Sequence, residues 1–292
     1  MYIDNNWYGH RFILSKYSEI EDKPSFASIQ HGWYKIPNLK QSKIKFAPFL
    51  CWNKRTADLC FKKKITNSVI IGSPFLYLDK IIPKKTLKNS GTIFFPSHSV
   101  PKSDRHPNAL KTSDNYNQNE IINSIEKISE APHTVCLYYT DYNQNNINMF
   151  KKKNWRVLTL GDRTNKERLF HLHKELSSVK NVISTDVNTT IFYALYLKKN
   201  VKVIYDKESK IINTNYDNEY AVGKKLFFEK YPELFNSFLG GEKGLNLAKE
   251  ELGYNFIKDK DEIVHLLGRN SFYKMIASKL IYYLMKIKYG LR

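Results

Sequence analysis

The sequence is poor in cysteine, and the few that it has show no spacing typical of a structural role. Its three cysteines, Cys51, Cys60 and Cys136, form neither a C-x-x-C pair nor another metal-ligand spacing. We therefore expect no disulfide framework and no structural zinc site. Cysteines used this sparingly favour a reducing compartment.

Long apolar runs are also missing from the sequence. The residues from Met1 to Arg11 are polar and include no apolar run behind a basic segment, so we expect no secretory signal. No stretch reaches the roughly 20 uncharged apolar residues that a membrane-spanning helix needs. We expect a cytoplasmic protein that is soluble or peripheral at the inner face of the plasma membrane.

Acidic residues are scarce relative to basic ones. The chain has 47 Lys and Arg against 28 Asp and Glu, which gives a formal net charge of +19. Such an excess favours an anionic partner: nucleic acid, an anionic membrane or a phosphorylated metabolite. The basic residues are spread along the chain without a zinc-finger or RNA-recognition signature, so charge alone does not choose among these partners.

The sequence does have short β-rich runs that alternate with amphipathic segments, a pattern typical of parallel sheets covered by helices. A chain of 292 residues with 42% hydrophobic content can form two domains. We predict an α/β fold with two Rossmann-like domains facing a cleft. The first is a small α/β domain on the acceptor side at 1–85, and the second is a nucleotide-binding domain at 91–265. A Pro- and Lys-rich linker at 82–90 would join them, and a basic amphipathic helix would follow at 268–292.

The strand ends are where we look for function, because ligands of open α/β sheets bind at the carboxyl ends of the strands. Strands are expected at 26–30, 45–52, 68–72, 92–95, 134–139, 156–160, 181–184 and 201–205. Helices are expected between 52 and 64 and at 119–130, 144–153, 166–177, 189–198 and 272–289. Four strand ends carry polar or small residues: Gln30-His31-Gly32-Trp33, Gly72-Ser73-Pro74, Pro96-Ser97-His98-Ser99 and Ser184-Thr185-Asp186-Val187-Asn188-Thr189-Thr190.

The segment from Ser184 to Thr190 is the most informative of the four. A strand, then hydroxyl residues, then a helix starting near Thr189 would place N–H groups and hydroxyls at a positive helix end, which is the outline of a phosphate site. The alternative is an ordinary helix cap, since Asn and Thr are favoured there in any case.

His31 follows a strand and precedes a glycine, where a sharp turn can leave the imidazole facing a cleft. It could act as a general base, because an unperturbed histidine takes up a proton near neutral pH. The alternative is a hydrogen-bonded histidine in a turn. His98 has a similar standing, and His106, in the polar segment 100–118, is a weaker candidate.

In this order and spacing, the four segments resemble those of GT-B-type glycosyltransferases of bacterial surface polysaccharides. These are the capsule, lipopolysaccharide and teichoic-acid polymerase-like enzymes, particularly those that use CMP-sugars. The resemblance covers 26–206. It implies that His31 is the base that activates the acceptor hydroxyl. It further implies that the donor site includes His98, Ser99, Ser184, Thr185, Asn188, Thr189 and Thr190, and that acceptor-side or cleft residues are Gly32, Trp33, Ser73 and His106.

The resemblance thus implies transfer of a sugar from a nucleotide donor to a cell-surface glycan or lipid-linked acceptor, with inversion. A CMP-linked acidic sugar, sialic-acid-like or Kdo-like, is the favoured donor. Tyr193 departs from the family, many members of which carry Glu there to hold the donor ribose. No cofactor or divalent metal is expected, on the premise that the chain lacks the Asp-x-Asp pair that would bind one.

Other functions stay open at this point. One is a CDP-polyol phosphotransferase of the same fold, another is a nucleic-acid-binding protein that uses its basic surface, and a third is a non-catalytic scaffold at the membrane. The C-terminal segment has five basic residues among aromatic and aliphatic ones, so it could lie on an anionic membrane or pack on the first domain. These residues are Lys274, Lys279, Lys286, Lys288 and Arg292.

Overall fold

The computed structural model describes residues 7–33, 47–83, 89–97, 118–204 and 229–268, together with 273, 276 and 280. The chain divides into two compact units. Unit 1 comprises Met1–Lys85, Arg163–Phe170 and Ala248–Arg292, and unit 2 comprises Thr86–Asp162 and His171–Leu247. Both units have a parallel sheet with helices, so the predicted α/β class is confirmed.

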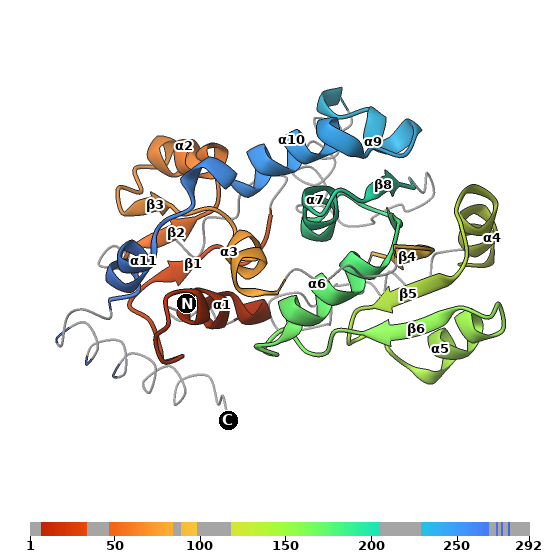
Figure 1. Ribbon diagram of the computed structural model, residues 1–292, viewed down its shortest axis with the longest axis horizontal. Coiled ribbons are helices and arrows are strands. Elements are labelled where there is room, and N and C mark those ends of the chain that lie inside the picture. The colour runs from red at the N-terminus through yellow and green to blue at the C-terminus, as the bar shows by residue number, and fades with distance from the viewer. Residues whose placement is uncertain are drawn as a thin grey trace. The chain divides into compact units, whose positions relative to one another are not determined.

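Unit 1 contains a sheet of three short parallel strands in the order β1-β2-β3 (Figure 1). Its register places Ile29 opposite Leu50, and Leu50 opposite Val69. The core of this unit is apolar and fully buried, with Leu14, Leu50 and Phe75 among its members. The elements are η1 (Trp7–Gly9), α1 (His10–Tyr17), β1 (Ser28–Ile29), β2 (Phe49–Cys51), α2 (Lys54–Lys62), β3 (Ser68–Ile70), α3 (Pro74–Ile81), η4 (Tyr254–Phe256) and α11 (Lys260–Leu266).

Unit 2 contains five parallel strands in the order β6-β5-β4-β7-β8. The chain builds outward from β4 through β5 and β6, then returns to the other side of β4 with β7 and β8. The sheet therefore has a topological switch point between β4 and β7, where ligands of doubly wound sheets bind. The elements are β4 (Thr92–Phe95), α4 (Gln118–Ile128), β5 (His133–Leu137), α5 (Gln144–Lys151), β6 (Arg156–Thr159), β7 (Asn181–Ser184), α7 (Thr189–Tyr196), β8 (Asn200–Val203) and α9 (Glu233–Asn236).

The chain passes from one unit to the other within each of two helices. Helix α6 (Arg168–Ser178) begins in unit 1 and ends in unit 2, and α10 (Gly241–Leu252) begins in unit 2 and ends in unit 1.

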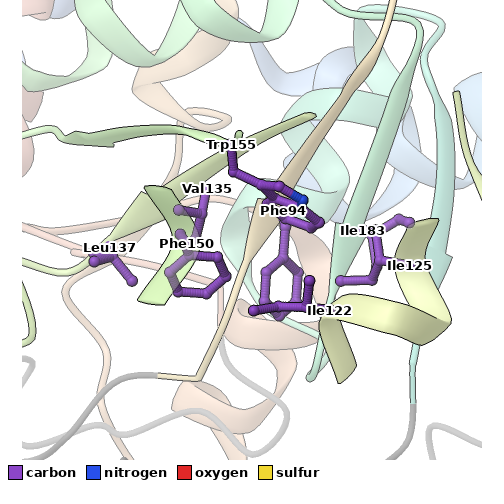
Figure 2. Close-up of a cluster of buried hydrophobic side chains, with 8 residues drawn as sticks. All are labelled: Phe94, Ile122, Ile125, Val135, Leu137, Phe150, Trp155 and Ile183. Carbon is purple, nitrogen blue, oxygen red and sulfur yellow. The ribbon is translucent and has the colours of Figure 1, made fainter. Parts of the chain in front are cut away.

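The core of unit 2 fixes the sheet that carries the strand ends. Helices α4 and α5 cover one sheet face, to which β4, β5 and β7 contribute apolar side chains. In Figure 2, Phe94 lies between Trp155 and Ile122, and its ring meets Trp155 edge-on at 6.3 Å between centroids. The cluster consists of Phe94, Ile122, Ile125, Val135, Leu137, Phe150, Trp155 and Ile183. Burial of this kind stabilises by about 25 cal/mol per Å² of apolar surface, so the cluster stabilises the sheet.

The segment after residue 247 packs on unit 1, which differs from the predicted extent of the nucleotide-binding domain, 91–265. The carbonyl oxygen of Leu252 accepts a hydrogen bond from the backbone N–H of Ser73 at 2.8 Å. Gly253 has a φ of 73° and lies so close to Trp52 that a Cβ would collide with its carbonyl oxygen. The physical reason is that glycine allows both the left-handed backbone and the close approach.

Some α-helices of unit 1 are not among those predicted from the sequence, and two of them lie in its first 85 residues. They are α1, and α3, which begins at Pro74 behind the N-cap Ser73. The predicted linker lies partly outside the described residues, and so does the C-terminal helix apart from Tyr273, Ile276 and Leu280. Within the described ranges, no helix is long and apolar enough to cross a bilayer.

Candidate functional site

The turn that carries His31 is shaped by the side chain of Gln30. The Gln30 amide is fully buried; it donates to the carbonyl oxygen of Gly32 at 2.8 Å and accepts the backbone N–H of Trp52 at 2.9 Å. The first bond closes the turn after β1, and the second ties the end of β1 to the end of β2. His31 is half-buried. The amide thus fixes the backbone on both sides of the imidazole.

Aromatic rings from the N-terminal segment surround the imidazole of His31. The Trp7 ring meets it edge-on with centroids 5.3 Å apart, and the Tyr8 ring lies at 6.4 Å. His10 is fully buried, and its ring contacts those of Tyr8 and Trp52 at 6.0 and 5.6 Å. The candidate base therefore lies in an aromatic environment rather than in an isolated turn.

Two histidines with different surroundings lie close together here. Burial, with a smaller contribution from the charge of His31, lowers the pKa of His10 to about 3, although the backbone of Gln30 opposes the shift. His10 therefore stays neutral near pH 7, and its Nδ1 has no hydrogen-bond partner among the described residues. A neutral His10 can support the neighbouring imidazole by packing, without adding a second positive charge.

Trp33 and Ser73, both predicted on the acceptor side, have structural partners in unit 1. The indole N–H of Trp33 donates to Glu251 at 2.7 Å, and Arg55 binds the same carboxylate oxygen at 3.0 Å while its guanidinium lies 5.1 Å from the Trp33 ring centroid. The hydroxyl of Ser73 is the N-cap of α3. Gly32 is buried in the same turn as His31.

In unit 2, those predicted donor residues that the structure describes lie at the switch point between β4 and β7. The hydroxyl of Thr185 accepts the backbone N–H of Ser97 at 2.7 Å and lies 2.9 Å from the Ser97 hydroxyl. The Ser184 hydroxyl donates to the carbonyl oxygen of Phe95 at 2.9 Å and accepts from the Asn188 amide at 2.9 Å. We call Ser97, Ser184, Thr185 and Asn188 the hydroxyl cluster.

The residues of this segment divide into two groups by burial. Ser184 and Thr185 are buried, and their hydroxyls hold the two strand ends together. Asn188 is the N-cap of α7 and accepts the Thr190 N–H at 2.9 Å. Thr189 and Thr190 are half-buried at the positive end of this helix. The helix cap is therefore observed, and the phosphate site at the two threonines beyond it stays a prediction.

The premise behind the expected metal independence is wrong, because the chain has one Asp-x-Asp spacing at Asp259-Lys260-Asp261. The structure gives this pair a local role: the Asp259 carboxylate accepts the Glu262 N–H at 2.8 Å as the N-cap of α11, in a capping box. Among the described residues, no group of three or more His, Cys, Asp or Glu side chains could hold a metal ion.

Three predicted site residues, His98, Ser99 and His106, lie outside the described residues. Conversely, sequence reasoning missed Trp7 and Tyr8, whose rings lie against His31, and the buried His10 beside them. No motif marks them, although a chain with 20 Tyr and 17 Phe can form ring-lined sites. Tyr193, the departure from the family pattern, is fully buried in α7.

Comparison with protein-family models found no family that matches the chain. Comparison with curated proteins likewise found no match. Among solved structures, the chain is similar to a point mutant of S. aureus TarM, crystallised in complex with fondaparinux, alpha-GlcNAc-glycerol and UDP. The two share 16% identity with a TM-score of 0.31, and the match covers 81% of this chain and 43% of that one. This chain spans less than half the length of that protein. A similarity this low identifies no family, so the chemistry of the site rests on its own residues.

Proposed function

We propose that the protein is a glycosyltransferase that moves a sugar from a nucleotide donor to a hydroxyl of a surface glycan. The observation that carries the proposal is the hydroxyl cluster, which lies at the switch point of a doubly wound sheet and leads directly into α7. Backbone N–H groups and hydroxyls at such a helix end suit a phosphate. A nucleotide donor presents a phosphate of this kind.

The threonines at the start of α7 would hold the donor phosphate. Thr189 and Thr190 remain half-buried after the buried Ser184 and Thr185 have joined the strand ends. Hydroxyl and N–H donors fixed in advance stabilise the negative charge that grows on the phosphate as it leaves. In this proposal the cluster builds the platform, and Thr189 and Thr190 bind the donor.

His31 would act as the general base. As the acceptor oxygen attacks the anomeric carbon, His31 takes the proton of that hydroxyl, and the bond between the anomeric carbon and the phosphate oxygen breaks. The nucleotide departs with the bonding electrons, and the configuration at the anomeric carbon inverts. Catalysis in this form requires a cleft in which the two units approach a shared substrate, and that cleft is part of the proposal.

A CMP-linked acidic sugar is the donor that we favour. Two features support it: the net charge of +19, which suits an anionic donor, and the resemblance of the ordered motifs to enzymes that use CMP-sugars. No bound metal is assigned a role, and the reaction is proposed to proceed without one. A CDP-polyol phosphate would suit the same phosphate site and is the alternative donor.

A donor screen tests this proposal. The purified chain is incubated with CMP-, CDP-, UDP- and GDP-linked compounds, and thermal stabilisation, donor hydrolysis and transfer are measured, with EDTA and added Mg²⁺ as paired conditions. We expect one nucleotide class to raise the melting temperature and to be turned over. Absence of both effects for all four classes, with tight salt-dependent binding to generic DNA or RNA instead, would favour the nucleic-acid alternative.

We also propose that the C-terminal segment contacts an anionic membrane, which would place the protein at the inner face of the plasma membrane. Tyr273, Ile276 and Leu280 are spaced as on one helix face and are 84%, 49% and 59% exposed. Five basic residues accompany them in the sequence between 274 and 292. Removal of 272–292, or Ile276→Ser with Leu280→Ser, should weaken binding to anionic vesicles. Unchanged binding by folded variants would contradict the membrane role.

A further inference from the structure

Among the described residues of unit 1, three with side chains have a left-handed backbone, namely Tyr8, Glu19 and Lys64, and Tyr8 is the one whose ring lies beside His31. Tyr8 has a φ of 61°, a left-handed conformation that is uncommon for a residue with a side chain and costs on the order of 1–3 kcal/mol. The next residue, Gly9, has a φ of 77° and approaches Lys166 so closely that a Cβ would collide with the Lys166 carbonyl oxygen. Residues in such conformations are frequent at ligand clamps and other functional sites, so this segment is a candidate functional site.

This strained segment is held against a second, distant segment of the same unit. The backbone N–H of Tyr8 donates to the carbonyl oxygen of Arg163 at 2.6 Å. Together with the close approach at Gly9, this bond brings residues 163–168 against residues 7–12. In Figure 1 these are the stretch that leads into α6 and the stretch that leads into α1. The backbone therefore fixes which side chains meet around His31.

The second segment places cations over the rings of the first. The Arg163 guanidinium lies 4.4 Å from the Trp7 ring centroid, and the Arg168 guanidinium lies 5.2 Å from that of Tyr8. The Lys166 ammonium lies 5.1 Å from the Phe12 ring. We call Trp7, Tyr8, His31, Arg163 and Arg168 the ring cluster.

Two cations of the second segment, Arg163 and Lys166, are available to an anion. Arg163 and Lys166 are exposed, and among the described residues neither forms an ion pair. A guanidinium that stacks on a ring makes this contact through its flat face. Its N–H groups point outward in the guanidinium plane, so two of them can still bind a carboxylate or phosphate together. The ring cluster therefore offers directed donors for an anion together with aromatic surface of the kind that packs on sugar rings.

We propose that the ring cluster is the acceptor subsite and that it selects a glycan bearing a carboxylate or phosphate group. Arg163 binds the anionic group, Trp7 and Tyr8 pack on the sugar, and the acceptor hydroxyl lies at His31. This assignment of substrate class rests on the proposed function, since it supplies that reaction with its acceptor. Selection of a charged acceptor also explains why the segment 163–168 is held next to the candidate base.

Calorimetric titration of the full chain with three kinds of oligosaccharide tests the subsite. The probes are oligogalacturonate, which carries carboxylates, a mannose 6-phosphate oligomer, and neutral maltohexaose. We expect one or both charged probes to bind at least about tenfold more tightly than maltohexaose, because charge-assisted hydrogen bonds form only with them. Binding of the carboxylate probe alone, or of the phosphate probe alone, identifies the group on the acceptor.

Variants distinguish binding by the ring cluster from nonspecific attraction by the basic charge of the protein. Arg163→Gln should weaken binding of the charged probe about tenfold, and Arg163→Lys should restore only part of it because a fork is lost. The matched control is Lys62→Gln, which removes one exposed charge of the same unit at the end of α2 and should change affinity little. Equal losses in Arg163→Gln and Lys62→Gln would overturn the subsite.

Two further outcomes would also overturn it: maltohexaose that binds as tightly as the charged probes, and no binding of any probe up to millimolar concentration. Folding of each variant is checked by its melting temperature. No nucleotide is present in these titrations, so their outcome is independent of donor use. A protein that turns over a donor yet ignores all three probes would retain the proposed function and lose this subsite.

Discussion

The two units of the molecule use their polar side chains in opposite ways. In unit 2, the hydroxyl cluster is bonded internally, strand end to strand end, and it leads into an eight-residue helix. In unit 1, the ring cluster is built from cations and aromatic faces on segments that are far apart in the sequence. We proposed that the first arrangement is the platform beside a phosphate site, and that the second binds a larger anionic partner.

The two candidate sites therefore depend on different kinds of support. Unit 2 has five strands and a large apolar core, and its candidate site follows the general rule for strand ends. Unit 1 has three short strands, and its candidate base depends on additions from the N-terminal segment and from residues 163–168. If the comparison holds, substitutions in the two units should affect different steps of the reaction.

The largest effect is expected at His31. Replacement by Ala or Asn removes the proton acceptor, so the turnover number should fall by about 10²- to 10⁴-fold while nucleotide affinity stays unchanged. Steady-state transfer assays and nucleotide titration measure the two quantities. His171→Ala, at an exposed histidine of unit 2, is the control. If a folded His31 variant keeps most of the wild-type transfer activity, His31 is not the general base. His98 and His106 would then be the next candidates.

The next effect concerns donor binding in unit 2. Thr189→Val combined with Thr190→Val removes two hydroxyls and keeps the branched shape, so donor affinity should fall about 10- to 100-fold at a nearly constant melting temperature. Thr134→Val on β5 is the matched control in the same unit. Unchanged nucleotide affinity in the double variant would contradict the assignment of the donor phosphate to the start of α7.

The buried imidazole of His10 in unit 1 should make the free energy of unfolding depend on pH. The folded pKa of about 3 lies below the unfolded value of about 6.5, so the unfolded chain binds the proton more readily. The free energy of unfolding should therefore fall as pH drops below about 6.5, by about 1.4 kcal/mol per pH unit from this group. Urea denaturation of wild type and His10→Phe at pH 7, 6 and 5 measures it. Parallel pH profiles of the two proteins would contradict the prediction.

The smallest expected effect concerns Asn188, and it distinguishes a helix N-cap from a donor-binding residue. Asn188→Ala and Asn143→Ala each remove the N-cap of a helix, α7 and α5 respectively, and each should cost about 1 kcal/mol of unfolding free energy. Only Asn188→Ala should also weaken donor binding, because it disturbs the residues beside Thr189 and Thr190. If both variants bind the donor like wild type, the segment from Ser184 to Thr190 is a cap and nothing more.

Much of unit 2 was predictable because its signals are local. Alternating apolar runs predicted β4 and β7 with the bounds that the structure has, and the hydroxyl residues after β7 predicted where a helix would begin. Parallel strands of one sheet end at one edge, so neighbouring strand ends were expected to meet. The exchange of bonds between Ser97 and Thr185 is consistent with that expectation.

By itself, the sequence determined the α/β class, the alternation in unit 2 and the position of His31 in a turn, since each depends on residues near one another in the chain. Only the tertiary structure decided what surrounds His31. Trp7, Tyr8 and Arg163 follow no periodic pattern, and they meet because Gly9 permits a close backbone approach and Tyr8 adopts a left-handed conformation. It likewise decided that residues after 247 pack on unit 1, because Gly253 fits against Trp52. Contacts between distant segments depend on shape in three dimensions, and a linear pattern of hydrophobic and polar residues does not encode that shape locally.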